Sequence, residues 1–234
     1  MSEKIKSAII LAAGYGKRMQ PITLEKPKPL IKIKGKPLIK YSIDLLELMN
    51  IDEIIINVHY KSDQIINFIN SLGNSKIFIS DETSKILDTG GGIKKAMKLI
   101  KNSSFFVINS DVLWDESQLD IMKEMSNEFD SSLADSLLCL TPIEYARGYN
   151  GSGDFTLMEN KKIRRYKLKD NNPMVYCGAQ IISKQALDNC NKEVFSINNV
   201  WNQSIPNGRL MGLKTEREIS HLSSPDMMKV FNNE

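Results

Sequence analysis

Residues 8–19 read AIILAAGYGKRM, an apolar run that leads into a glycine-rich turn with two basic side chains. The run 8–12 is apolar at every position, which is typical of a strand covered on both faces of a parallel sheet. The carboxyl end of such a strand, at a glycine-rich turn, is where open α/β sheets bind phosphorylated ligands. The stretch therefore predicts an α/β fold with a ligand crevice at its first turn.

The rest of the first half alternates apolar runs with helical patterns. Apolar residues recur at helical spacing over residues 38–49, and the shorter apolar runs fit buried strands. Such alternation is typical of right-handed βαβ units and of a mostly parallel, Rossmann-like sheet flanked by helices. The predicted strands are 53–58, 76–80 and 105–109, and the predicted helices are 38–49, 62–72 and 91–100.

The pattern changes after Pro142. A helix at 116–125 and a strand at 132–140 are expected before it, and strands without intervening helices follow it, which indicates a small antiparallel extension. Because no internal repeat or linker-like stretch interrupts the chain, we expect one domain over residues 1–234. The later expected strands are 154–158, 162–168, 175–182 and 210–213, with short helices near 183–190 and 196–205 and a terminal helix.

Composition narrows the class of protein. The chain has 234 residues, with 31 basic and 28 acidic side chains and a formal net charge of +3. That balance argues against a nucleic-acid or membrane surface. The three cysteines form no CxxC pair, which argues against a disulfide framework or a zinc site. The apolar run at 8–13 is too short for a signal peptide or a membrane span, so a cytoplasmic protein is expected.

The first turn carries residues suited to phosphate. Gly14 and Gly16 let backbone N–H groups approach phosphate oxygens, and Arg18 offers a bidentate, permanently charged contact. Two standard phosphate motifs do not match. Met19 stands where a dinucleotide GxGxxG motif needs glycine, and Arg18 stands where a P-loop needs serine or threonine. A purely structural turn is the alternative interpretation.

Two further features point to polyphosphate chemistry. Pro27 and Pro29 stiffen the backbone on both sides of Lys28, which would aim its ammonium group; a solvated surface lysine is the alternative. The predicted strand 105–109 ends at Asn109 and is followed by Asp111. A carboxylate at this edge of the sheet faces the crevice and suits Mg²⁺, although an aspartate after a strand can simply cap a turn.

These motifs together closely resemble the signature of sugar-phosphate nucleotidyltransferases, G-x-G-[TKE]-R-[ML] followed by P-K-P. The matching stretches are LAAGYGKRM at 11–19, PKPL at 27–30 and GKPL at 35–38. The resemblance implies the nucleotide-diphospho-sugar transferase fold and the condensation of a nucleoside triphosphate with a sugar 1-phosphate, assisted by Mg²⁺, with release of pyrophosphate. It implies that Arg18 and Lys28 are catalytic contacts to the phosphates and that the nucleotide lies on Leu11, Ala12, Ala13, Gly14 and Gly16.

The same resemblance assigns roles along the rest of the chain. It makes Asp111 the metal ligand, places Asn109 near the nucleotide, and places Glu82 and Gly90 beside the base. Residues 1–142 would form a nucleotide-binding half and residues 143–234 a sugar-binding half.

Within the family the sequence is most similar to bacterial N-acetylmuramate 1-phosphate uridylyltransferases of cell-wall recycling. The stretches concerned are DTGGGI at 88–93, INSDV at 108–112, GSGDF at 151–155 and YCGA at 176–179. They imply that Asp154 and Gly178 lie near the acceptor sugar. Mannose 1-phosphate guanylyltransferases share most of this pattern, so base and sugar stay open. A CTP-using cytidylyltransferase and a catalytically silent nucleotide-binding regulator remain alternatives.

One position departs from the family pattern. Family members usually end in W-x-D-V-G-T, whose aspartate is a second metal ligand, and His221 falls at that place in ISHLSS (219–224). A neutral imidazole is a poor Mg²⁺ ligand and a better one for softer metals. His221 could instead contact a phosphate or a metal-bound water, or be a packed histidine.

Overall fold

The computed structural model describes residues 4–233, and a central sheet of nine strands runs through them. Its main path has the order β10-β9-β11-β6-β1-β4-β5, with β7 on β11 and β12 on β7. The strands are β1 (Ser7–Leu11), β4 (Glu53–Val58), β5 (Ile77–Asp81), β6 (Ser104–Asn109), β7 (Ser136–Pro142), β9 (Phe155–Leu157), β10 (Ile163–Arg165), β11 (Pro173–Ser183) and β12 (Leu210–Lys214).

The first half of the sheet is parallel and the second half is mainly antiparallel. β1 pairs in parallel with β4 on one side and with β6 on the other, and β5 extends β4 in parallel. Beyond β6 the chain adds β11 antiparallel, and β7 and β9 pair antiparallel with β11. This arrangement confirms the predicted α/β fold class with a parallel sheet and an antiparallel extension.

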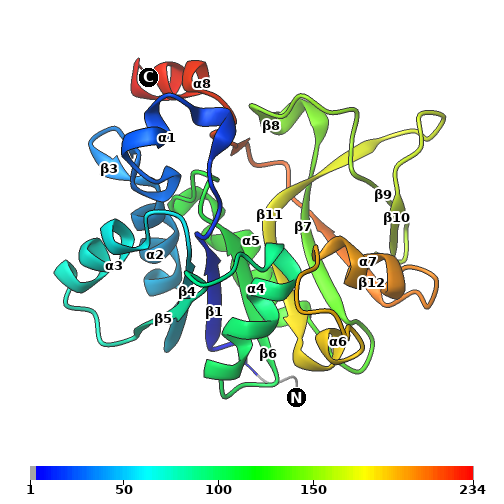
Figure 1. Ribbon diagram of the computed structural model, residues 1–234. Coiled ribbons are helices and arrows are strands. Elements are labelled where there is room, and N and C mark those ends of the chain that lie inside the picture. Colours follow the sequence, from blue (N-terminus) through cyan, green and yellow to red (C-terminus); the bar gives the residue numbers. More distant parts are fainter. Residues whose placement is uncertain (1–3, 234) are drawn as a thin grey trace.

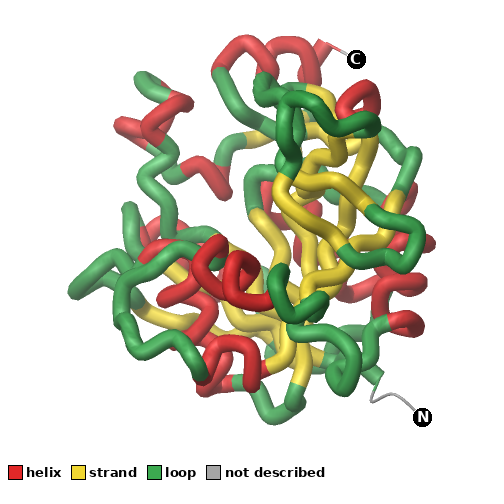
Figure 2. The backbone as a smooth tube through the Cα atoms, turned by 90° about the vertical axis from the view of Figure 1, so that its right-hand side faces the viewer, coloured by secondary structure: helices red, strands yellow, loops and turns green. Residues whose placement is uncertain are grey.

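Helices cover both faces of the sheet (Figures 1 and 2). Successive side chains of β1 point to opposite faces, so Ala8 and Ile10 join one core while Ile9 joins the other. The first core packs against α2 (Leu38–Leu48), α3 (Ser62–Ser71) and α5 (Leu119–Glu128). The second core packs against α4 (Asp88–Ala96), α6 (Lys184–Asp188) and α7 (Asn198–Ser204).

Two predicted strands differ from the structure by three or four residues at one end. The strand expected at 132–140 is β7 at 136–142, because Asp130 holds a turn before it. The Asp130 carboxylate accepts from the backbone N–H and the hydroxyl of Ser132, and the Asp130 carbonyl accepts from Ala134 N. The strand expected at 162–168 stops at Arg165, where a turn closed by Asp170 begins.

A layer of short elements lies over the carboxyl ends of the parallel strands (Figure 1). The apolar side chains of Met19, Ile31 and Leu38 form a small core there with Leu222 and Phe231. The layer consists of η1 (Lys17–Met19), α1 (Ile22–Glu25), η2 (Lys28–Leu30), β2 (Lys32–Ile33), β3 (Lys36–Pro37), β8 (Ala146–Arg147), β13 (Ile219–Ser220) and α8 (Pro225–Asn233). It fixes the turn that follows β1.

The helices of residues 4–233 include none with the length and apolar character needed to cross a membrane.

Candidate functional site

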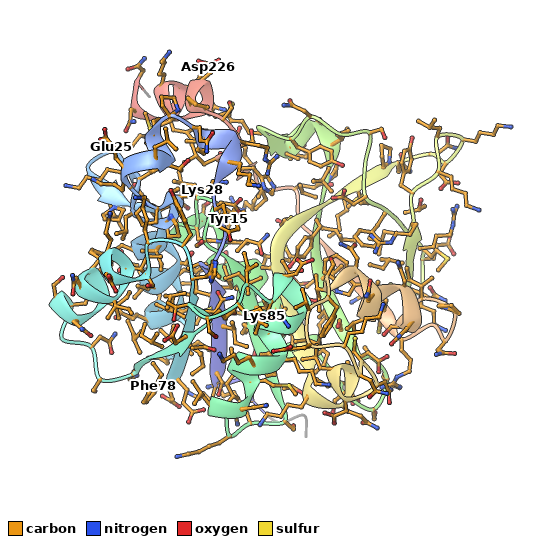
Figure 3. All side chains as sticks on the ribbon, in the orientation of Figure 1. Tyr15, Glu25, Lys28, Phe78, Lys85 and Asp226 are labelled. Carbon is orange, nitrogen blue, oxygen red and sulfur yellow. The ribbon has the colours of Figure 1, made fainter. Side chains whose placement is uncertain are left out.

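A cavity of about 390 Å³ opens at the carboxyl ends of β1 and β6. Most of the residues that the sequence singled out line it: Leu11, Ala12, Ala13, Gly14, Gly16, Arg18, Lys28, Glu82, Asn109 and Asp111. Gly90, Asp154 and Gly178 are not among the lining residues. Figure 3 shows Tyr15 and Lys28 above β1, where the cavity lies.

The glycine-rich turn is held in shape by close packing. Gly16 has a φ of 63°, which favours glycine, and its carbonyl accepts from Met19 N at 2.8 Å and from Thr23 Oγ1 at 3.0 Å. A Cβ on Gly16 would lie 2.9 Å from Thr23 Cγ2 and 3.2 Å from Lys28 Cβ. By contrast, a Cβ on Gly14 would meet no atom within 4 Å. Gly16 is therefore needed for the turn itself, and Gly14 faces open space in the cavity wall.

Lys28 and Asp111 form an ion pair in the cavity. Lys28 Nζ donates to Asp111 Oδ2 at 2.7 Å, and the lysine side chain is 13% exposed. Burial of Asp111 opposes its ionisation, but the ammonium of Lys28 outweighs this effect and holds the pKa of Asp111 below its usual range. His221 and Arg18 add smaller effects in the same direction. The cavity thus holds an ionised carboxylate beside a directed lysine.

Asn57 connects the glycine-rich turn to Glu82, and the sequence analysis did not single it out. Asn57 is 3% exposed; its Oδ1 accepts from Ala12 N at 2.7 Å and its Nδ2 donates to Glu82 Oε1 at 2.7 Å. The signal in the sequence is a single polar residue inside the apolar strand 53–58. Asn57 lines the same cavity.

Glu82 is a buried carboxyl with few partners. Burial raises the pKa of Glu82, and the hydrogen bonds from Asn57 Nδ2 and Leu87 N oppose that rise. Gly92 allows α4 to pass close by, because a Cβ there would lie 2.7 Å from Glu82 Oε1. The Glu82 carbonyl contacts His59 Nδ1 at 2.6 Å. His59, which is half-buried, therefore contacts the backbone of the segment that carries Glu82.

Gly90 supports the wall from outside. A Cβ on Gly90 would lie 2.3 Å from the ring of Phe195, and the Phe195 backbone bonds to both Gly91 N and Leu87 O. The glycines that open α4 thus admit the segment 193–195, while Asp88 and Thr89 line the cavity. These two lining residues were also absent from the predicted set.

Gly178 and Asp154 belong to the antiparallel half of the sheet, Gly178 within β11 and Asp154 directly before β9. Gly178 has a φ of 84°, and a Cβ there would lie 2.9 Å from Val112 Cγ2 and 3.2 Å from Asn109 Cβ. Asp154 accepts from Tyr149 Oη at 2.9 Å and from Tyr176 N at 2.9 Å, which ties the loop before β9 to β11. Burial and the Asp154 carboxylate raise the pKa of Tyr149 to about 12, so this phenol stays protonated at neutral pH.

His221 lies next to Asp111, as the alignment with the family pattern implied. His221 forms an antiparallel bridge with Val112, and Leu222 N donates to Asp111 O at 2.9 Å. Its Nε2 is buried without a hydrogen-bond partner among residues 4–233. Burial lowers the pKa of His221, so the imidazole is neutral at pH 7.

The cavity offers few side-chain ligands to a metal ion. No group of three His, Cys, Asp or Glu side chains suited to a metal gathers within residues 4–233. Asp111 still offers a hard carboxylate oxygen on the wall of the cavity, and Mg²⁺ commonly binds through one or two carboxylates together with phosphate oxygens and waters. The residues therefore fit a magnesium ion that arrives with a triphosphate.

Comparison with known proteins decides the family. The model of the family "Nucleotidyl transferase" matches residues 7–192, which include every residue of the cavity wall. The chain belongs to this family. It is a sugar-phosphate nucleotidyltransferase, an assignment supported by its relatives. Nucleotidyl transferases commonly use a divalent metal.

Two curated relatives carry the same name. The N-acetylmuramate α-1-phosphate uridylyltransferase of Caulobacter vibrioides is 31% identical over 229 residues, covering 96% of this chain and 95% of the relative. That of Neisseria meningitidis is 32% identical over 183 residues, covering 77% of each chain. Mannose-1-phosphate guanylyltransferase 1 of Arabidopsis thaliana is 31% identical over 180 residues, which cover 74% of this chain and 47% of the relative.

Solved structures share the fold over nearly the whole chain. HddC from Yersinia pseudotuberculosis, crystallised with GMP-PN, has a TM-score of 0.77 at 25% identity and covers 98% of this chain and 99% of its own. The inositol-1-phosphate CTP transferase of T. maritima has a TM-score of 0.80 at 18% identity, covering 99% and 95%, which shows a common fold alone.

Proposed function

We propose that this nucleotidyl transferase condenses UTP with N-acetylmuramate 1-phosphate, in cell-wall recycling, to give the UDP-sugar and pyrophosphate. The observation that carries the proposal is the relative from Caulobacter vibrioides, which is aligned over nearly the full length of both chains. The guanylyltransferase match covers less than half of its relative, so it supports GTP and mannose 1-phosphate less well.

The proposed reaction is a single in-line displacement. An oxygen of the sugar 1-phosphate forms a bond to the α-phosphorus of UTP, and the bond from that phosphorus to the bridging oxygen of the β-phosphate breaks. The electron pair leaves with pyrophosphate. Since the nucleophile is already an anion, no catalytic base is required, and catalysis consists of positioning two anions and stabilising the charge on the leaving group.

The cavity residues take roles that follow from their chemistry. We propose that the turn from Leu11 to Gly16 holds the triphosphate through its backbone, and that Arg18 and Lys28 contact the phosphates. Asp111 would hold Mg²⁺, which when bound supplies positive charge beside the phosphates. Glu82 and the wall that Gly90 supports would flank the base, beside Asn109. The acceptor sugar would lie on the half formed by 143–234, near Asp154 and Gly178.

Lys28 has to exchange partners in this scheme. Its ammonium group donates to Asp111 Oδ2, and Asp111 is also the residue that would hold Mg²⁺. A bound triphosphate would give Lys28 a second anionic partner in the same cavity. The Lys28–Asp111 pair therefore holds both side chains in the cavity before substrate binds.

The test is a matrix of four nucleoside triphosphates against several sugar 1-phosphates, read by pyrophosphate release with Mg²⁺. We expect the highest kcat/KM for UTP with N-acetylmuramate 1-phosphate. A preference for GTP with mannose 1-phosphate or for CTP would replace this substrate pair. Nucleotide binding without turnover across the whole matrix would favour the silent regulator.

The same assay tests Lys28. We expect Lys28→Ala to lower the rate by about 10²–10³, because it removes one preorganised positive charge that would stabilise the leaving group. Lys32→Ala, an exposed lysine on β2, is the matched control and should stay close to the wild-type rate. A Lys28→Ala enzyme as fast as that control would remove the lysine from the scheme.

A further inference from the structure

A second cavity of about 390 Å³ lies on the outer side of α4, and the function proposed above does not use it. We call it the lysine cavity, because five of its ten lining residues are lysines. It is lined by Ser84, Lys85, Leu87, Gly91, Lys94, Lys95, Lys98, Asn191, Lys192 and Glu193. Figure 3 shows Lys85 beside α4 at this face.

The helix and the loop after α6 build the lysine cavity together. Gly91, Lys94, Lys95 and Lys98 follow helical spacing, so their Cα atoms share one face of α4 and of the turn η3 (Met97–Leu99) that continues it. The loop packs directly on that face, since a Cβ on Gly91 would lie 2.2 Å from Glu193 O. Lys94 Nζ donates to Cys190 O at 2.6 Å and so fastens the loop to the helix.

Positive charge in the lysine cavity exceeds the negative charge near it. Lys85 Nζ lies 2.6 Å from Glu193 Oε2, and it is the only one of the five lysines in an ion pair with a carboxylate among residues 4–233. Lys94 and Lys95 donate to backbone carbonyls instead. Asp81 and Glu82 are the other nearby carboxylates, and both interact with Lys95 at longer range. Five ammonium groups therefore face three carboxylates, and a concave surface concentrates their field.

The chemistry of the lining selects a phosphate chain. Ammonium groups bind phosphate oxygens as point charges, and one di- or triphosphate can accept hydrogen bonds from several of them at the same time. No aromatic side chain stands among the lining residues within 4–233, so nothing in the lysine cavity offers a stacking surface to a base. The cavity is as large as the nucleotide cavity, which leaves room for such an anion.

The segment 82–91 separates the two cavities. Ile86, Asp88 and Thr89 line the nucleotide cavity, while Lys85 and Leu87 line the lysine cavity. This thin wall is held on both sides: Leu87 N donates to Glu82 Oε2 at 3.3 Å, and Phe195 N donates to Leu87 O at 3.2 Å. The Lys85–Glu193 ion pair also joins this segment to the loop after α6. An anion that draws Lys85 away from Glu193 would therefore change the contacts that hold the wall.

We propose that the lysine cavity is a regulatory site for the phosphate chain of a di- or triphosphate anion, coupled through the segment 82–91 to the nucleotide cavity. The anion can be free, as in pyrophosphate, or part of a nucleotide, and the lining recognises the chain that both share. Binding there does not depend on which sugar the enzyme uses.

Calorimetry with tripolyphosphate tests the binding. The double variant Arg18→Gln, Lys28→Gln serves as the background and removes two cations from the nucleotide cavity. Binding that this background variant retains therefore reports the lysine cavity. Lys94→Gln with Lys98→Gln should weaken that binding tenfold or more. Lys32→Gln with Lys123→Gln removes the same charge from exposed positions outside both cavities and should change it less than twofold. Equal weakening by both pairs, or by neither, would overturn the proposal.

Two further arms decide the ligand and the coupling. Tripolyphosphate and UTP should bind the background variant with similar affinity, and a strong preference for the nucleotide would contradict recognition of the chain alone. In the otherwise wild-type enzyme, tripolyphosphate should change the KM for the nucleotide by about fivefold or more beyond simple competition. The Lys94→Gln, Lys98→Gln variant should show pure competition. Pure competition in the wild type as well would refute the coupling.

Discussion

Asn57 is the residue whose removal should be felt in both stability and nucleotide binding. Asn57→Leu keeps a side chain of similar size but removes the acceptor for Ala12 N and the donor to Glu82 Oε1, both of which are 2.7 Å contacts of a residue that is 3% exposed. Each buried polar group left without its partner costs about 1–3 kcal/mol. The expected loss is therefore about 2–6 kcal/mol, a large share of the 5–15 kcal/mol that is typical of folded proteins.

The loss should also depend on pH. Burial already raises the pKa of Glu82, and loss of the Asn57 hydrogen bond removes one of the contacts that oppose this rise. A group with a raised folded-state pKa contributes stability at low pH and loses that contribution as pH rises through the folded-state value. Asn57→Leu should therefore be less destabilising at pH 5 than at pH 7.5.

Urea unfolding at both pH values measures these effects, and the KM for the nucleoside triphosphate shows whether the glycine-rich turn is disturbed. Asn70→Leu makes the same change on the exposed face of α3 and should stay within about 0.5 kcal/mol of the wild type. A double-mutant cycle with Glu82→Gln isolates the contact between the two side chains. An Asn57→Leu enzyme with a loss below about 1 kcal/mol and an unchanged KM would refute the reasoning, because the bond to Ala12 N would then carry nothing.

Three other changes test separate parts of the structure. Gly178→Ala should cost about 2 kcal/mol or more in urea unfolding, since it adds a left-handed φ penalty to a 2.9 Å contact with Val112, whereas Gly73→Ala has open space and should pay the φ penalty alone. Burial lowers the pKa of His221, so below pH 6.5 the unfolded chain binds more protons than the folded one. The free energy of unfolding should therefore decrease by up to about 1.4 kcal/mol for each pH unit of acidification in that range. His221→Gln should flatten this slope. Asp170 accepts two hydrogen bonds from Arg164, which hold the pKa of Asp170 well below its usual range. Asp170→Asn should therefore speed amide exchange in residues 163–170 at pH 7. Exchange as slow as in the wild type would contradict the role of Asp170 in holding this turn.

The sequence predicted those parts of the fold that depend on local pattern. Continuous apolar runs marked β1 and β6 because both faces of these strands are buried, and helical spacing marked α2 and α3. The start of β7 was missed because the turn before it is held by one carboxylate, Asp130, whose hydrogen bonds override the β propensity of the residues that follow.

The predictions of site residues divide in the same way, into those that a local pattern marks and those that it does not. Arg18, Lys28 and Asp111 stand out as charges in motifs, and the structure brings them to one cavity. Asn57 acts through two partners that are 45 and 25 positions away in the chain, so no local pattern reveals it. Gly90 beside the base stays a prediction from its motif; its contact with Phe195, in a loop distant along the chain, could not be read from that motif.

The small core above the sheet has a consequence for how the protein is made. Met19 and Ile31, on the underside of the loop that carries Arg18 and Lys28, are covered by Leu222 and Phe231, and Lys34 N bonds to Asn232, 198 positions further along the chain. During translation the sheet strands β1, β4 and β6 leave the ribosome long before α8 does. The loop that carries Arg18 and Lys28 therefore stays uncovered on this side until the ribosome has released residues 222–232, and it cannot take up its mature geometry before then.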